Sequence, residues 1–62
     1  MLIFERFYDP YTIQIYQHSK CDFGYRILSR GMVIDCGESS AIESFDRAME
    51  LAIAQLEFHR SN

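Results

Sequence analysis

Lysine is nearly absent from this sequence, and basic residues are outnumbered by acidic ones. Lys20 is the one lysine, and six Lys and Arg residues stand against nine Asp and Glu residues, which gives a net charge of −3. A protein that binds a nucleic-acid backbone or an anionic membrane surface needs clustered Lys and Arg side chains. The charge balance therefore argues against nucleic acid or a membrane as the main partner.

Long apolar runs are missing as well. No segment approaches the roughly 20 consecutive apolar residues of a membrane-spanning helix. Residues 1–6 form too short an apolar run for a secretory signal and lack a basic start. We therefore expect a cytoplasmic protein, in which Cys21 and Cys36 are free thiols. A disulfide between them is also conceivable, because both would lie at the same end of a small sheet.

Proline and glycine are scarce, with one and three residues, and no low-complexity tract interrupts the chain. What is abundant is apolar surface, since 48% of the residues are hydrophobic and 15% are aromatic. Disordered chains carry less of both. A chain of 62 residues is long enough for one small core. We expect a single domain over residues 1–62.

Three segments have the residue pattern of β-strands. In the first, Tyr11, Ile13 and Ile15 alternate with polar residues, so this face should meet the core. Gly31 supplies a turn before the third segment, and strands so close in sequence can pair only antiparallel. The three segments are residues 11–17, 23–30 and 32–36. Residues 1–10, which end in a turn at Pro10, form a fourth strand, an arm or an exchanged element.

Residues 40–59 have the periodicity of an amphipathic helix. Ser40 and Glu43 fit a capping box at its start. The predicted apolar stripe consists of Ile42, Phe45, Ala48, Met49, Ala52, Ile53 and Leu56. The sequence therefore predicts an α+β domain, with a three- to four-stranded antiparallel meander and one long C-terminal helix packed on one face.

A second side of this helix is apolar too. At about 100° per residue, Leu51 and Phe58 project away from the predicted stripe, with Ala54 beside them. Either the N-terminal segment covers them with Phe4 and Phe7, or they form an interface with a second copy or another protein. We expect these five residues to belong to a partner interface.

Acidic residues occupy the sector between the two apolar sides of the helix. They are Glu43, Asp46, Glu50 and Glu57. Such a line is most simply a solvated face, and the alternative is an acidic ridge that docks on a basic surface of another protein.

Chemistry-bearing residues are few and scattered. His18 and Cys21 have a spacing that zinc uses, but Cys36 and His59 are isolated, whereas zinc ligands usually come as two close pairs. The glycines do not form a phosphate-binding loop. We therefore expect neither an enzyme nor a bound metal or cofactor.

A different use of the sheet would be nucleic-acid binding. Tyr11, Tyr16, Phe23 and Tyr25 would stack on bases, and Arg26 would contact phosphate. The segment 37–48, which runs from a Gly through small polar residues into a helix rich in Glu and Ala, loosely resembles HicB-type antitoxin domains. The glycine-rich, proline-containing strand segment of those domains is absent. The same helix start is similar to the last third of a double-stranded RNA-binding domain, with Ala41, Ile42 and Glu43 where that family has lysines.

These observations favour a protein-binding module. In size, acidity and lack of a reactive site, the chain resembles small phage-encoded inhibitors of host machinery, including anti-defence proteins. That resemblance implies a small acidic regulator or inhibitor of a larger protein. The alternative is a HicB-like antitoxin or nucleic-acid-binding module that uses the sheet.

Overall fold

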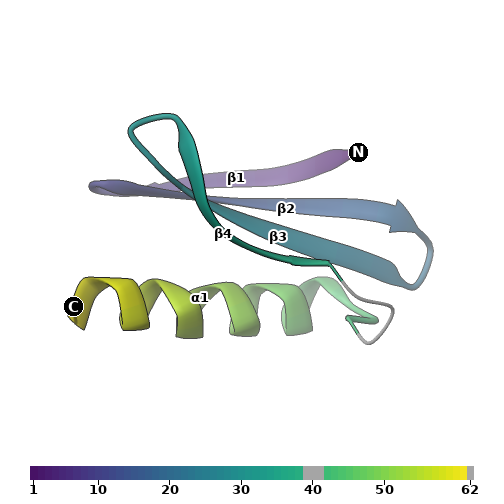
Figure 1. Ribbon diagram of the computed structural model, residues 1–62. Helices are drawn as coiled ribbons and strands as arrows, with labels where there is room; N and C mark the ends of the chain where they lie inside the picture. The colour runs from purple at the N-terminus through teal and green to yellow at the C-terminus, as the bar shows by residue number, and fades with distance from the viewer. Residues whose placement is uncertain (39–41, 62) are drawn as a thin grey trace.

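A four-stranded antiparallel sheet and one helix make up the computed structural model, which describes residues 1–38 and 42–61 (Figure 1). The elements are β1 (Leu2–Tyr8), β2 (Tyr11–Ser19), β3 (Asp22–Ser29), β4 (Met32–Glu38) and α1 (Phe45–Ser61). The strands lie in the order β1-β2-β3-β4, so each pairs with its neighbour in sequence. The predicted α+β meander is confirmed, and residues 2–8 form its fourth strand.

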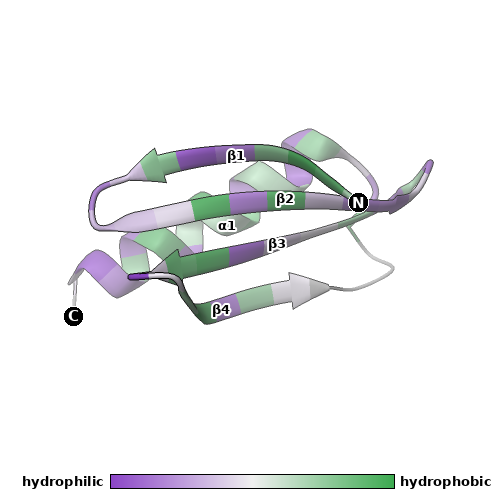
Figure 2. Ribbon diagram, turned by 90° about the horizontal axis from the view of Figure 1, so that it is seen from above, coloured by the Kyte–Doolittle hydropathy of each residue, from purple (hydrophilic) through white to green (hydrophobic). Residues whose placement is uncertain are grey.

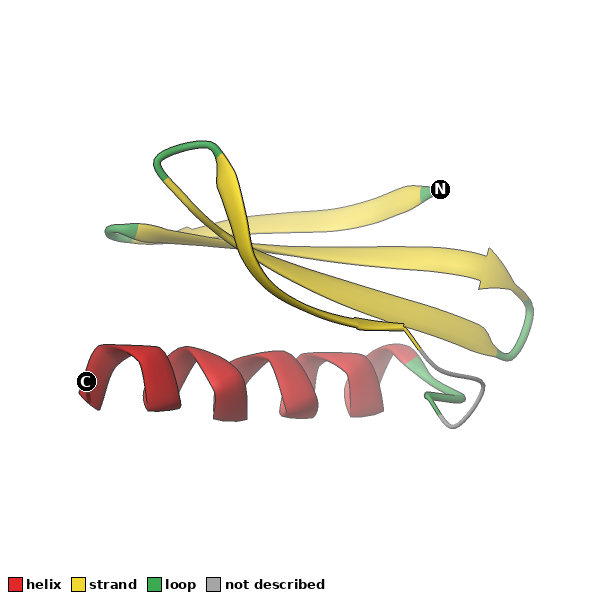
Figure 3. Ribbon diagram, viewed as in Figure 1, coloured by secondary structure: helices red, strands yellow, loops and turns green. Residues whose placement is uncertain are grey.

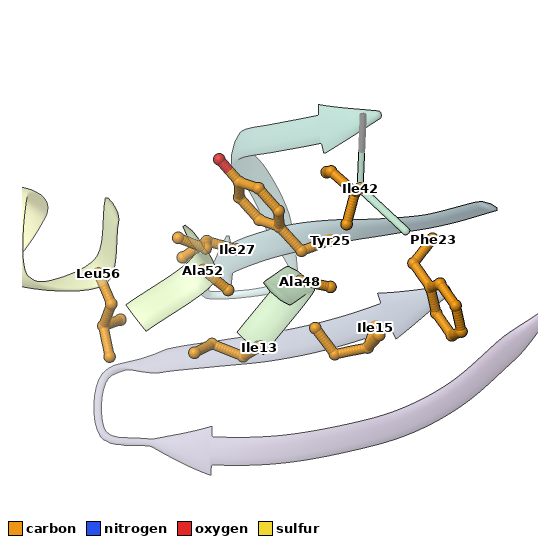
Figure 4. Close-up of a cluster of buried hydrophobic side chains, with 9 residues drawn as sticks. All are labelled: Ile13, Ile15, Phe23, Tyr25, Ile27, Ile42, Ala48, Ala52 and Leu56. Atoms are coloured by element: carbon orange, nitrogen blue, oxygen red, sulfur yellow. The ribbon is translucent and has the colours of Figure 1, made fainter. Parts of the chain in front are cut away.

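The core lies between the sheet and α1, which packs along one face only (Figure 3). Ile13 and Ile15 of β2 and Ile27 of β3 are fully buried there, as their alternation predicts. Figure 4 shows these side chains pointing toward Ala48, Ala52 and Leu56 of the helix. The complete buried cluster is Ile13, Ile15, Phe23, Tyr25, Ile27, Ile42, Ala48, Ala52 and Leu56.

In the β2–β3 and β3–β4 hairpins, the strands end at other residues than the alternation pattern predicts. β3 stops at Ser29, and Arg30 and Gly31 form a two-residue turn with φ values of +55° and +81°. Positive φ at both central residues is the geometry that matches the right-handed twist of a hairpin. The expected strand end at Arg30 is therefore wrong. The β2–β3 hairpin is longer than expected, because Ser19 still pairs with Asp22.

The helix begins later than the sequence predicts. α1 starts at Phe45, and the Ser44 hydroxyl accepts a hydrogen bond from the Arg47 amide at 3.1 Å, so Ser44 is the N-cap. A helix from Ser40 is therefore wrong, and Ser40 itself lies outside the described residues. Ile42 is buried as expected but precedes the helix, where its carbonyl accepts the amide of Phe23 at 3.0 Å.

Gly37 on β4 leaves room for an aromatic ring on β3. A Cβ atom at this position would lie 2.1 Å from Cε2 of Tyr25, whose side chain is buried.

Within the described residues, no helix is long and apolar enough to cross a membrane.

Candidate binding surface

Among residues 1–38 and 42–61, no helix lies on one face of the sheet, and we call it the outer face (Figure 2). Successive side chains of a strand point to opposite faces. Since Ile13 and Ile27 are buried against α1, their neighbours Thr12 and Leu28 belong to the outer face. Residues that pair across neighbouring antiparallel strands share a face, so the registers assign outer-face positions on β1 and β4 as well.

An apolar row crosses the outer face from one edge of the sheet to the other. Phe7 pairs with Thr12, Thr12 with Leu28, and Leu28 with Val33. Phe7 is 66% exposed and Val33 is 51% exposed, although both are large apolar side chains. We define these four residues as the apolar row. A row of apolar side chains with exposed members at both ends is a candidate for a surface that meets another protein.

A polar row lies next to it, made of Glu5, Gln14, Arg26 and Cys36, which pair in that order. Gln14 Nε2 donates to Glu5 Oε2 at 2.6 Å, and Gln14 Oε1 accepts from the Tyr16 hydroxyl at 2.7 Å. Arg26 donates to the same hydroxyl at 3.4 Å and lies 4.5 Å from the centre of the Tyr16 ring. Three strands are thereby joined by one hydrogen-bonded network.

The two edge strands carry most of the exposed apolar surface in the described residues. The exposed large apolar side chains on these strands are Leu2, Ile3 and Phe7 of β1, and Met32, Val33 and Ile34 of β4. The exposed large apolar side chains on the described residues of the helix are Ile53 and Phe58. The best candidate for a binding surface is therefore the sheet and its edges, not the helix face that the sequence favours.

The residues of the predicted helix interface do not all lie on one exposed side of α1. Leu51 is half-buried and packs against the core, so its expected position opposite the core is wrong. Ile53, expected in the buried stripe, is 39% exposed. The buried arc is centred on Ala48 and Ala52, and Leu51 and Ile53 lie about 100° to either side of Ala52. Phe58 and Ala54 are exposed, as expected.

The predicted N-terminal aromatics lie on different faces of β1. Phe4 pairs with the buried Ile15, and its ring meets Phe45 edge-to-face at 5.3 Å between centroids. Phe4 therefore anchors β1 to the start of the helix. Phe7 belongs to the apolar row. Neither buries Phe58, which is 62% exposed.

The acidic residues of the helix face solvent. Asp46, Glu50 and Glu57 are exposed and lie on one line of α1, since steps of four and seven residues nearly complete whole turns. Glu50 forms an ion pair with Arg47. Glu43 is exposed too but precedes the helix. The structure therefore brings three of the four predicted residues together.

The scattered histidines and cysteines do not converge. His59 bonds Asp35 of β4 at 3.0 Å, which ties the end of α1 to the sheet, and Cys21 and Cys36 are free and exposed. In the described part of the chain, no three His, Cys, Asp or Glu residues gather as a metal site would require. Burial, followed by the negative charges of Asp35 and Cys36, raises the pKa of Tyr25 above its ordinary value of 10.0.

The aromatics considered for base stacking are also separated. Phe23 and Tyr25 are buried under the helix, and Tyr11 donates to the carbonyl of His59 on that side. Tyr16 remains on the outer face, with Arg26 over its ring. The structure thus does not assemble these residues into a stacking platform.

Sequence reasoning did not single out Leu28 and Val33 as binding residues. The signal was present in Leu28, an apolar residue that strand alternation in the sequence places between Arg26 and Arg30. The cross-strand partners of Leu28 could not be read from the sequence, because a register shift separates Ile27 and Leu28 in their pairing with β4.

No known protein family, curated protein or solved structure matches this chain. The HicB-like and RNA-binding-like features of residues 37–48 therefore have no support beyond their residue pattern. Function has to be argued from the geometry of the chain itself.

Proposed function

We propose that this protein is a non-enzymatic protein-binding module and that the outer face of the sheet is its interface. The observation that carries the proposal is the apolar row, in which Phe7 and Val33 are more than half exposed at opposite edges. A partner that covers the row removes apolar surface from water, which is the main favourable term in most protein association. The cytoplasmic regulator or inhibitor suggested by the composition would act through this surface.

The size of the effect follows from the exposure of two side chains. Full burial of a Phe or Val side chain contributes about 1.5–3 kcal/mol, and between half and two thirds of each side chain is open to solvent here. Replacing Phe7 and Val33 by threonine should remove about 2 kcal/mol of binding free energy, or roughly thirty-fold in affinity. Threonine keeps the β-propensity of both positions, so the sheet should persist.

The test compares two matched double variants. The first is Phe7→Thr with Val33→Thr on the sheet, and the second is Ile53→Gln with Phe58→Gln on the helix. Each is immobilised and used to capture proteins from a lysate of the source cells, after circular dichroism has shown an unchanged fold. The proposal expects capture to fall for the sheet variant alone.

Loss of capture by the helix variant alone would move the interface to the helix. Equal capture by the wild-type protein and both variants would refute the outer face as a binding surface for a different protein.

A further inference from the structure

We infer that the occupant of the outer face is a second copy of this chain, related by a twofold axis that runs parallel to the strands between β2 and β3. The inference rests on the proposed function and names its partner. It places two sheets face to face, with a helix on the outside of each.

Charge favours a second copy on this face. The apolar and polar rows together contain one acidic residue, Glu5, and one basic residue, Arg26, so they are neutral although the chain carries −3. On α1, by contrast, Asp46, Glu50 and Glu57 line up on the exposed side. Two copies that met through their helices would bring like charges together, and two that meet through the rows do not.

The strand order makes the apolar row complementary to itself. The proposed axis exchanges β1 with β4 and β2 with β3. Phe7 of one copy then faces Val33 of the second copy, and Thr12 faces Leu28. Each apolar row lies along the other, within the rotation of about 30° that twisted sheets adopt when they pack.

The same axis avoids every like-charge contact in the polar row. Glu5 faces Cys36 of the second copy, and Gln14 faces Arg26. A twofold axis laid along the polar row would instead set Glu5 against Glu5 and Arg26 against Arg26. A twofold axis laid along the apolar row would place the polar row of each copy beyond the end of the other copy's sheet. Only the axis parallel to the strands therefore matches both rows.

Three members of the polar row, Glu5, Gln14 and Arg26, already have hydrogen-bond partners within one chain, which reduces the cost of covering them. Glu5, Gln14, Tyr16 and Arg26 share hydrogen bonds of 2.6, 2.7 and 3.4 Å within one chain. A buried polar network is tolerated when its members are satisfied. Covering this row with a second sheet therefore leaves these bonds in place.

The outer face is the size of a small interface. Four strands of seven to nine residues, about 4.8 Å apart and rising about 3.3 Å per residue, give it a flat area of roughly 500 Å² before side-chain relief is added. A standard interface takes about 800 Å² of accessible surface from each partner. Figure 1 shows that the β3–β4 turn rises away from α1, so the outer face is curved rather than flat.

Cys36 offers a direct test, because it faces Glu5 of the second copy. In a Cys21→Ser background, Glu5→Cys creates a thiol opposite Cys36 across the interface. Packed sheets lie about 10 Å apart, so a bismaleimide with a reach of about 8 Å should join the two side chains into a covalent dimer. Within one chain the same positions are three strands apart, about 14 Å, which is beyond that reach.

Two controls use the same chemistry. Cys21→Ser alone leaves Cys36, and the two copies of Cys36 lie at opposite edges of the sandwich. Cys21→Ser with Glu57→Cys puts the second thiol on the outer side of the helix. Both controls should give little covalent dimer. Light scattering across a concentration series should show a wild-type dimer. In Phe7→Thr with Val33→Thr, the dissociation constant should rise about a thousand-fold, because a twofold interface contains each residue twice.

A wild-type monomer at every concentration would overturn the second copy as occupant. So would a covalent dimer that forms equally well from Cys36 alone, because that would require a different axis. If the wild type is monomeric while the sheet variant still loses capture of a foreign protein, the inference fails and the proposed function stands. If the sheet variant changes neither self-association nor capture, both fail.

Discussion

Replacing Gly37 by alanine should destabilise the protein by about 1–3 kcal/mol, the usual cost of overpacking a core. The new Cβ would lie 2.1, 2.7 and 2.9 Å from three atoms of the Tyr25 ring. These atoms belong to a ring that is only 7% exposed, so it has little room to move aside. A domain of this length has about 3–9 kcal/mol of total stability, of which the substitution would take a large share.

Thermal and urea unfolding followed by circular dichroism measure this loss. The melting temperature should fall by roughly 4–24 °C, at about 4–8 °C for each kcal/mol. In a Tyr25→Leu background the same glycine substitution should cost little, because the ring it meets is gone. Gly31→Ala is the contrasting control: no atom lies within 4 Å of its Cβ, but φ is +81°. Its cost is backbone strain, which Gly31→Asn should largely avoid.

The reasoning is refuted if Gly37→Ala unfolds within about 0.5 kcal/mol of the wild type, which is the range of neutral surface substitutions. It is also refuted if the loss is as large in the Tyr25→Leu background, because the ring contact would then not be the cause.

Four further predictions follow from the fold. Ser44→Ala should cost about 0.5–2 kcal/mol by thermal unfolding, whereas Ser44→Asp, another good N-cap, should cost little. The pKa of Tyr25 is raised above 10.0 in the folded protein, so the contribution of this phenol to stability should be constant below pH 10.0 and should decline as the pH rises through the pKa of the folded state. Urea unfolding at alkaline pH should show this decline, and Tyr25→Phe should remove the part of the pH dependence that comes from this phenol. Asp35→Asn weakens a pair whose side chains are about a quarter exposed, so urea unfolding should show a loss below about 1 kcal/mol. Leu56→Ala should cost about 2–5 kcal/mol in urea, enough to unfold much of the population.

The elements were predictable where local pattern and tertiary packing agree. The alternation of Ile13 and Ile15 reports a buried strand face in the sequence and in the structure alike. The 3.6-residue period likewise places Ala48, Ala52 and Leu56 in the core. In both cases one short window contains the whole signal.

The helix start could not be predicted, because a contact distant in sequence decides it. Ser40 and Glu43 form a valid local cap, but the carbonyl of Ile42 accepts the amide of Phe23, which lies 19 positions earlier. A residue whose carbonyl accepts from β3 does not belong to the helix, so the cap moves to Ser44. The later start leaves Glu43 outside the predicted acidic line.

The candidate surface could not be predicted for a related reason. Its rows depend on register, and a register shift lies between Ile27 and Leu28 in the pairing of β3 with β4. Such a shift changes which residues lie opposite one another, so the alternation along one strand does not give the pairing. Only the pairing itself shows that Phe7 and Val33, far apart in sequence, end the same row.

The position of α1 after all four strands has a consequence for synthesis. Every strand pairs with its neighbour in sequence, so the hairpins can form as the chain emerges, but the helix that covers Ile13, Ile15 and Ile27 comes last. At about 5–20 residues per second, the 17 residues of α1 take roughly 1–3 s to make. During that interval both faces of the sheet are uncovered, including the apolar face formed by Ile13, Ile15 and Ile27. A nascent chain of this protein should therefore be a better chaperone substrate before α1 is complete than after it.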